Sequence, residues 1–434
     1  MQSNESLRDE LLAEVEAVAP ILAEHAPLSE KLGRLDEPTV EALSKTRLLR
    51  FACPRELGGC EADPVTGMEI FEAVTRIDGS VGWTLGILAL TSAIAGAFLP
   101  VTTAQRIFAR GVPPMAGLLA PIGKAEPVDG GYRVTGRWAF GSGIHHADWV
   151  LTGAFVPGQP LPAGIRMVVL PRGQVAIHDN WQVAGLKASG SCDYSIENAF
   201  VPDEMTFPFM DAIRGNAVTG GAALRLGVPA FVIPFHMAIA LGIARRALDE
   251  ITEQAVEKAR GRPPSPLATH PHFQFALGKA ELQLASARAL AFQVLSRIWT
   301  EARAGRVPPP PMQAEARAAA VYITEVAQRV TTAAFQSAGG GALFDTNPLQ
   351  RCFRDVPRRG ATFRDEPVCL SRPRPVQARP AGRQSNALAN QGPQAPIGNH
   401  LLPLVEAALS GAASAPRQPI TRFGRPDNGA VGSP

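Results

Sequence analysis

The sequence lacks the marks of several protein classes. Its cysteines include no Cys-x-x-Cys pair, which argues against a zinc site and a disulfide framework, so we expect reduced thiols and no metal. No window approaches the ~20 uninterrupted apolar residues of a membrane span, and the N-terminus has no basic-then-apolar secretory pattern. These absences favour a cytoplasmic protein without a membrane role. The five cysteines are Cys53, Cys60, Cys192, Cys352 and Cys369.

A dinucleotide-binding fingerprint is also missing. No Gly-x-Gly-x-x-Gly segment follows a predicted strand, which argues against a Rossmann site. The 434 residues are enough for two or three domains, each with its own core.

The first third of the chain has helical patterns only. Apolar residues recur at helical spacing from about residue 7 to 27, and a second helix is predicted over about 38–49. Asp63-Pro64 starts another helix by the usual cap-then-proline pattern. The apolar run Trp83–Leu99 is too short and too rich in small residues for a membrane span, so we expect a buried core helix. We predict an N-terminal helical domain over residues 1–115.

The apolar period changes from 3.6 to two after Pro113-Pro114. We therefore predict strands, joined by Gly/Pro turns, in a middle antiparallel β domain over residues 116–212. An alanine-rich helical pattern then returns, with breaks near Gly261 and Pro308, which predicts a C-terminal helical bundle over 213–356. The fold class is α+β. The alternating residues of the first strand are Tyr132, Val134, Gly136, Trp138 and Phe140, and later strands are predicted near 149–155, 166–170, 175–178 and 194–200.

The most informative segment for chemistry lies between Gly136 and Trp149. It reads GRWAFGSGIHHADW, a strand that enters a Ser-Gly turn with two histidines and a second tryptophan. Aromatic rings, a hydroxyl beside two glycines, and imidazoles can hold a flat polarizable ring and act on one of its edges. We therefore expect a flavin here.

The order of helices, β domain and helical bundle, taken with Gly136-Arg-Trp-x-Phe-x-Ser-Gly143, resembles the acyl-CoA dehydrogenase superfamily. The greater likeness is to the oxygenase component of two-component flavin-dependent monooxygenases, the group of p-hydroxyphenylacetate hydroxylase and the secosteroid phenol hydroxylases. The resemblance covers about residues 7–356. Supporting segments are Gly33-Arg-Leu, Pro54-x-Glu-Leu-Gly-Gly, Asp78-Gly-Ser-x-Gly-Trp83, Trp181-x-Val-x-Gly-Leu-Lys-Ala-Ser-Gly-Ser191, Ser337-Ala-Gly-Gly-Gly-Ala-Leu-Phe, Pro348-Leu-Gln-Arg and Arg354-Asp355.

The resemblance implies an activity and its partners. Reduced FMN or FAD, delivered by a separate flavin reductase, would react with O2 to a C4a-hydroperoxyflavin in a water-excluded pocket. This species would hydroxylate a phenolic or polycyclic aromatic substrate. The resemblance also implies a closed oligomer, a homotetramer.

The resemblance places several candidate residues at the flavin. Ser142 would hydrogen-bond near N5, although a turn serine can equally satisfy its own backbone. Trp83 and Trp138 could stack on the ring or be ordinary core. His145 and His146 are adjacent and point apart, so at most one faces the pocket. We choose His146 as catalytic with Ser142, and Gly141 and Gly143 as flavin-binding.

Three further segments are expected to contact the flavin. The strand that begins Ile165, Arg166 and Met167 would contribute backbone groups, as it does in family members. Arg260 and Arg262 lie at a helix end, where one of them could bind a flavin phosphate or only the helix dipole. Gly340 and Gly341, in a run of three glycines, would bring backbone amides to the flavin across a subunit interface.

The resemblance fails after Val356. Residues 1–356 contain 32 Lys+Arg and 35 Asp+Glu, whereas residues 357–434 contain ten arginines, no lysine, four acids and twelve prolines. This tail is too poor in large apolar residues to fold by burial, so we expect disorder. The family has a histidine shortly after the position of Arg354-Asp355, and here none occurs before His400. We interpret residues 357–434 as the product of a frameshift, a genuine disordered tail being the alternative.

Two other functions stay open at this point. An acyl-CoA dehydrogenase proper needs a glutamate base, and no Tyr-Glu-Gly-type segment supplies one. An inactive family member or scaffold is the other alternative, because the altered C-terminus removes the expected histidine base for the phenol. Nucleic-acid binding is not expected, since the arginines of the tail are sparse and not interleaved with aromatics. The sequence leaves the substrate, the reductase and the choice between FMN and FAD undetermined.

Overall fold

Helices come first along the chain, as the sequence predicts. The computed structural model describes residues 4–261 and 263–356, and its first five helices are α1 to α5. Aspartates cap three of them: Asp36 accepts from Thr39 N–H at the start of α2, and Asp63 and Asp78 cap α3 and α4 in the same way. The helices are α1 (Asn4–Leu32), α2 (Glu37–Ser44), α3 (Pro64–Ile77), α4 (Gly79–Phe98) and α5 (Val101–Phe108).

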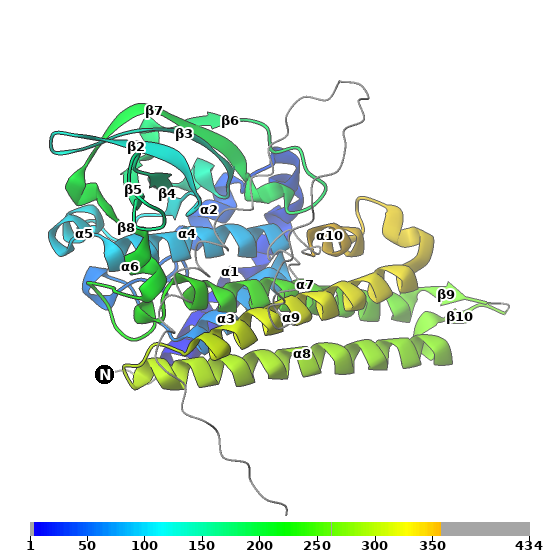
Figure 1. Cartoon of the computed structure of the whole chain (residues 1–434). Helices are drawn as coiled ribbons and strands as arrows, with labels where there is room; N and C mark the ends of the chain where they lie inside the picture. Colours follow the sequence, from blue (N-terminus) through cyan, green and yellow to red (C-terminus); the bar gives the residue numbers. More distant parts are fainter. Residues whose placement is uncertain (1–3, 262, 357–434) are drawn as a thin grey trace, which may run out of the picture.

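A single twisted sheet forms the middle of the chain and lies above α4 in Figure 1. Its strands are ordered β6-β7-β3-β2-β4-β5-β8, with β1 beside β4. The strands are β1 (Met115–Ala116), β2 (Pro121–Val128), β3 (Gly131–Gly141), β4 (Trp149–Phe155), β5 (Ile165–Pro171), β6 (Ala176–His178), β7 (Cys192–Pro202) and β8 (Thr206–Pro208).

The sheet is mixed, which corrects the antiparallel sheet expected from the sequence. β2 and β3 form a hairpin, and β4 then pairs with the other edge of β2, so that β2 and β4 run parallel. β1 is also parallel to β4. Alternating apolar residues identify strands but carry no information on the order in which those strands pair.

The C-terminal helices form a bundle under the sheet. Three long helices, α7, α8 and α9, run side by side, and α4 lies between the sheet and α7 (Figure 1). The predicted breaks near Gly261 and Pro308 separate these helices. The elements are α6 (Phe209–Arg214), α7 (Val228–Glu257), β9 (Ala259–Arg260), β10 (Ser265–Pro266), α8 (Pro271–Arg303), α9 (Pro310–Ala338) and α10 (Pro348–Asp355).

Two helices, α4 and α7, are long and apolar enough to cross a membrane by length and composition. In the structure, 89% of the apolar window of α4 and 78% of that of α7 are buried inside the protein. Both are therefore buried core helices, α4 beneath the sheet and α7 within the bundle. Within the described ranges the cysteines are free thiols, and no cluster of three or more metal-ligating side chains occurs there.

Candidate functional site

A tight turn at the end of β3 presents Ser142. The strand bulges between Trp138 and Gly141, where Phe140 has a left-handed φ of 61°. Gly143 follows with a φ of 70°, and its N–H donates to the Ser189 carbonyl at 2.9 Å. This bond ties the turn to the loop before β7, so Ser142 is held from two sides.

Phe140 is a candidate that the sequence pattern misses. Strict alternation along β3 predicts an inward side chain, but the bulge reverses the phase and leaves Phe140 56% exposed. Its ring meets Trp181 edge-on, with centroids 6.1 Å apart. A signal was available, because Phe140 is the second aromatic of the Trp-x-Phe-x-Ser-Gly segment and stands two residues before Ser142.

Trp138, unlike Phe140, is buried in the protein core. Its side chain is fully buried, stacks on Tyr194 with centroids 5.5 Å apart, and donates Nε1–H to the Gly153 carbonyl at 3.0 Å. The ring therefore belongs to the core of the β domain and has no surface left for a flavin. We remove Trp138 from the candidate site for this reason.

A chain of hydrogen bonds leads from Trp83 through three serine hydroxyls. The Trp83 Nε1–H donates to Ser142 Oγ at 2.9 Å, and Ser142 Oγ lies 2.7 Å from Ser191 Oγ. Ser191 Oγ in turn lies 2.7 Å from Ser189 Oγ. All three serines are buried. The structure thus joins Trp83 and Ser142, both of which the resemblance places at the flavin, and adds Ser189 and Ser191, which were not candidates from the sequence.

Helix α4 positions Trp83, and α7 supplies its neighbours. The Trp83 ring lies 5.3 Å from the Phe235 ring and 6.1 Å from the His236 ring, between centroids. Burial lowers the pKa of His236 to about 4, so this imidazole is neutral near pH 7. His236 was also missed, because one histidine in an apolar helical run looks like ordinary core.

The two adjacent histidines point apart, as predicted. His146 lines an apolar cavity of about 370 Å³ between α2 and α4, together with Thr84 and Leu88. Burial first, and then the nearby His145 and Arg34, lower the pKa of His146 to about 4. Its buried Nε2 has no hydrogen-bond partner among the described residues.

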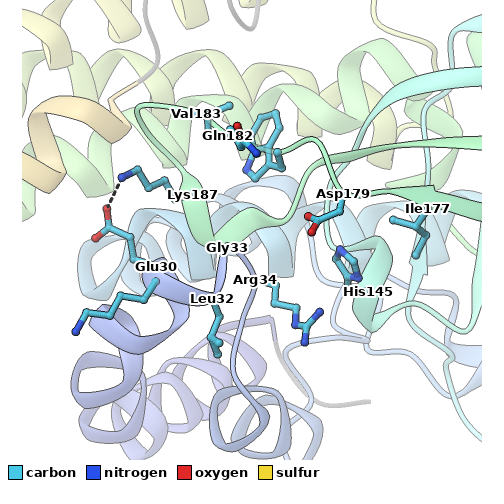
Figure 2. Close-up of a pocket in the computed structure, with 12 residues that line it drawn as sticks. Glu30, Leu32, Gly33, Arg34, His145, Ile177, Asp179, Gln182, Val183 and Lys187 are labelled. Atoms are coloured by element: carbon cyan, nitrogen blue, oxygen red, sulfur yellow. Dashed lines mark ion pairs between the residues drawn. The ribbon is translucent and has the colours of Figure 1, made fainter.

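His145 faces a separate cleft of about 670 Å³ beside the end of α1, shown in Figure 2. Arg34 and Asp179 lie on either side of its ring, and Lys187 reaches Glu30 across the cleft at 4.0 Å. Burial and Arg34 lower the pKa of His145. The cleft is polar and bordered by charges of both signs.

Gly141 and Gly143 are explained by close packing. A Cβ at Gly141 would lie 2.8 Å from Tyr194 Cδ1, and one at Gly143 would lie 3.1 Å from Thr84 Cγ2. A flavin contact by either glycine stays a prediction.

The structure does not bring Ile165, Arg166 and Met167 to the Ser142 turn. They begin β5, where Ile165 pairs with Phe155 of β4, and the backbone of Arg166 and Met167 pairs with β4 on one side and β8 on the other. At the other end of β5, Pro171 pairs with Trp149, which is the first residue of β4. The backbone of Arg166 and Met167 is therefore paired within the sheet on both sides, and a flavin contact by this strand stays a prediction.

The glycine run and Arg260 lie together at the C-terminal end of α9. Arg260 Nη2 donates to the Ser337 carbonyl at 2.9 Å, and Lys258 Nζ donates to the Ala338 carbonyl, so both cations cap the C-terminal end of α9. Gly340 and Gly341 follow in the turn Gly339–Leu343, where Gly340 is exposed. Figure 1 places β9, which carries Arg260, far from β3. Arg262 lies outside the described residues.

Comparisons with known proteins agree with this fold. Residues 235–359 match the family model for the acyl-CoA dehydrogenase C-terminal domain. Indole-3-acetate monooxygenase of Pseudomonas putida is 30% identical over 346 residues, which are 79% of this chain and 87% of that protein. The FADH(2)-dependent resorcinol hydroxylase oxygenase component of a Rhizobium species is 26% identical, over 80% of this chain and 88% of its own length. The crystal structure of 3-HSA hydroxylase from Rhodococcus sp. RHA1 superposes with a TM-score of 0.74, at 26% identity, over 80% of this chain and 91% of that chain.

The helices, sheet and helical bundle therefore define an acyl-CoA dehydrogenase-like flavoenzyme fold. Within it, the chain belongs to the flavin-dependent monooxygenases, as a relative of their oxygenase components.

Proposed function

We propose that this protein is the oxygenase component of a two-component system that hydroxylates a phenolic or polycyclic aromatic compound with O2 and reduced FMN or FAD. A separate reductase would supply the reduced flavin, in the cytoplasm. When bound, the flavin supplies the chemistry that activates O2. The protein binds and orients the flavin, excludes water and holds protons at defined atoms.

The observation that carries the proposal is the position of Ser142. Its hydroxyl lies at a strand end, bonded to Trp83, two residues after the exposed ring of Phe140. An exposed aromatic face beside a fixed hydroxyl fits a flat heterocycle that has one hydrogen-bonding edge. We assign Ser142 to the flavin N5 edge, and Phe140 and Trp83 to the walls around the ring.

Two histidines lie near these residues: His146 follows Ser142 by four residues, and His236 of α7 lies beside the Trp83 ring. Both have pKa values of about 4, so each is a neutral imidazole near pH 7 and a weak base. Neither is matched to ionising a phenol, whose ideal base has a pKa near the working pH. The position at which the family has its histidine base falls after Arg354-Asp355, where this chain has no histidine before His400.

We further propose a homotetramer in which Lys258, Arg260 and Gly340 bind the phosphate of a flavin held by a neighbouring subunit. Support comes from two cations beside an exposed glycine turn and from the separation of this turn from Ser142 within one chain. Two exposed apolar side chains, Leu343 and Phe344, lie next to the same turn. An arginine and backbone amides are well suited to a phosphate.

The test is flavin binding followed by product analysis. The full chain is titrated with FMN and with FAD, oxidised and chemically reduced, and then supplied with a flavin reductase, ¹⁸O2 and a panel of phenols. We expect saturable binding of reduced flavin and incorporation of one ¹⁸O atom into an aromatic product. A parallel assay supplies acyl-CoA thioesters in place of the phenols, and their oxidation would contradict the proposal in favour of a dehydrogenase. Flavin binding without any hydroxylated product would indicate an inactive family member, and absence of flavin binding would overturn the flavin assignment itself.

A further inference from the structure

The proposed function gives no role to the cavity of about 370 Å³ between α2 and α4. Its volume is typical of small-molecule sites. Aliphatic side chains form much of its wall, and its charged lining residues, Lys45 and Arg50, are exposed to solvent. The aliphatic lining residues include Leu35, Val40, Leu43, Leu49, Leu85, Leu88 and Val112. The cavity therefore suits an apolar body, with the charges kept near water.

His146 brings a polar group to this apolar wall. The turn after β3 holds it there, because the His146 N–H donates to the Gly143 carbonyl at 2.9 Å and Ile144 between them is fully buried. Gly143 in turn packs on α4: a Cβ at Gly143 would lie 3.1 Å from Thr84 Cγ2 and 3.2 Å from Leu88 Cδ2. Thr84 and Leu88 also line the cavity. The position of the imidazole is therefore set by the turn and by α4 together.

The imidazole of His146 is uncharged and has an unused nitrogen. Its pKa of about 4, lowered chiefly by burial, keeps it neutral near pH 7. Neither ring nitrogen has a hydrogen bond within residues 4–261 and 263–356, and Nε2 is enclosed by protein atoms. Nδ1 is not enclosed in this way, so it is the nitrogen that a ligand can reach. Depending on the tautomer, Nδ1 offers either an N–H or a lone pair.

A hydroxyl group fits both tautomers of His146. It can donate to the Nδ1 lone pair or accept from the Nδ1 N–H, whereas a carbonyl can only accept. A charged group beside a neutral imidazole would lose its hydration at a high cost, and a rigid ring fills an apolar space with little loss of entropy. We propose that this cavity binds an uncharged ring compound that carries a hydroxyl group, with His146 Nδ1 as its hydrogen-bond partner. This site goes beyond the proposed function, since it requires no flavin.

Phenol and toluene are matched probes of this hydrogen bond. They have nearly the same shape and differ by a hydroxyl in place of a methyl group, so the ratio of the toluene Kd to the phenol Kd reports the bond. We expect His146→Leu to lower this ratio about 10-fold, because the buried hydroxyl would be left without a partner. His146→Asn places an amide nitrogen near the position of Nδ1 and should keep the ratio within about threefold of the wild type. The pair 2-naphthol and 2-methylnaphthalene extends the comparison to two rings.

Two further variants test the location of the site. Val112 lines the cavity and is half-buried, so the indole of Val112→Trp would take the space of the ligand and weaken phenol binding by about 10-fold or more. His178→Leu is the matched control. His178 is also a half-buried histidine, bonded to Ser195 Oγ at 2.9 Å, and it does not line this cavity. Its substitution should leave both Kd values unchanged.

The measurement is isothermal titration calorimetry of the full-length wild type and the four variants without flavin, with far-UV circular dichroism to check folding. Equal ratios in the wild type and His146→Leu, or wild-type affinity in Val112→Trp, would overturn the inference. So would a wild type that binds neither phenol nor 2-naphthol. Should His146→Leu not fold, Val112→Trp still carries the test. Because no flavin is present, the result is independent of the flavin titration that tests the proposed function.

Discussion

At the scale of single residues, Trp83 determines how Ser142 is held. Its indole N–H fills one acceptor position of Ser142, while its ring packs against Phe235. Trp83→Phe keeps an aromatic ring for packing and removes the donor, so we expect a loss of about 1 kcal/mol in the free energy of unfolding. Urea denaturation measures this loss. Trp138→Phe, which removes the bond to the Gly153 carbonyl, is a comparable buried control. A Trp83→Phe variant as stable as the wild type would show that the bond to Ser142 contributes little.

At the residue level, the resemblance placed Trp83 and Ser142 at one flavin site. The structure joins these two side chains by a hydrogen bond of 2.9 Å, and their contact with a flavin stays a prediction. The exposure of Phe140 could not be predicted, because the bulge between Trp138 and Gly141 exchanges the inward and outward faces of the strand and leaves no mark in the alternation. Trp138 lies before this bulge, and its burial is the core alternative that the sequence left open. The bonds that link Ser142 to Ser191 and Ser189 were out of reach for a different reason: residues 142 and 191 are far apart in the sequence, and no sequence pattern pairs them.

At the scale of elements, the junction of α4 and α10 is sensitive to pH. Asp355 ends α10 and accepts the Leu186 N–H at 2.7 Å, and burial together with the nearby Asp78 carboxylate raises the pKa of Asp355 to about 7. A carboxyl group whose pKa is raised by folding stabilises the folded state below its unfolded pKa of about 3.9, and this contribution is lost as the pH rises through the folded value. We therefore expect the stability of the wild type, relative to Asp355→Asn, to fall between about pH 4 and pH 7.

The comparison of the wild type with Asp355→Asn isolates this carboxyl group. The variant imitates the protonated side chain and removes its titration, while groups such as His146 and His236 contribute equally to both proteins. Their lowered pKa values reduce stability as the pH falls from about 6.5 toward 4, which is the opposite trend. Urea unfolding at pH 5 and at pH 8 measures the difference. A difference that does not change with pH would mean that Asp355 stays in one protonation state across this range.

Elements themselves were easier to predict than their pairing. The Asp63 cap and Pro64 located the start of α3, and the apolar run located α4. Both signals could be read because they act within a few residues. The parallel pairing of β2 with β4 was not predictable, since it depends on which edge of a hairpin the next strand joins. The place of Ile165–Met167 at the end of β5 away from the Ser142 turn was not predictable for the same reason: a strand can be found from its composition, but its position in the sheet cannot.

At the scale of the whole molecule, the composition changes beyond α10, and the described fold ends at Val356. From residue 357 onward the sequence has ten arginines and no lysine, and the histidine that the family places shortly after Arg354-Asp355 is missing until His400. If a frameshift caused this change, one of the other two reading frames after codon 356 should encode a helix that contains a histidine and then an early stop codon. The nucleotide sequence tests this directly, and two frames without such a helix would leave a genuine tail as the explanation.

If residues 357–434 come from a frameshift, correcting the reading frame should change turnover but not flavin binding. The serine chain, Trp83 and Phe140 all precede residue 357, so the chain as written and a frame-corrected chain should bind reduced flavin with similar Kd values. Only the frame-corrected chain would have the base that ionises a phenol, and general-base catalysis contributes on the order of 10²- to 10⁴-fold in rate. We therefore expect equal flavin titrations but product formation slower by about that factor in the chain as written, measured with the same reductase and substrate. Equal turnover by both chains would assign the base to a residue before 357, and the neutral imidazoles of His146 and His236 would be the first to substitute.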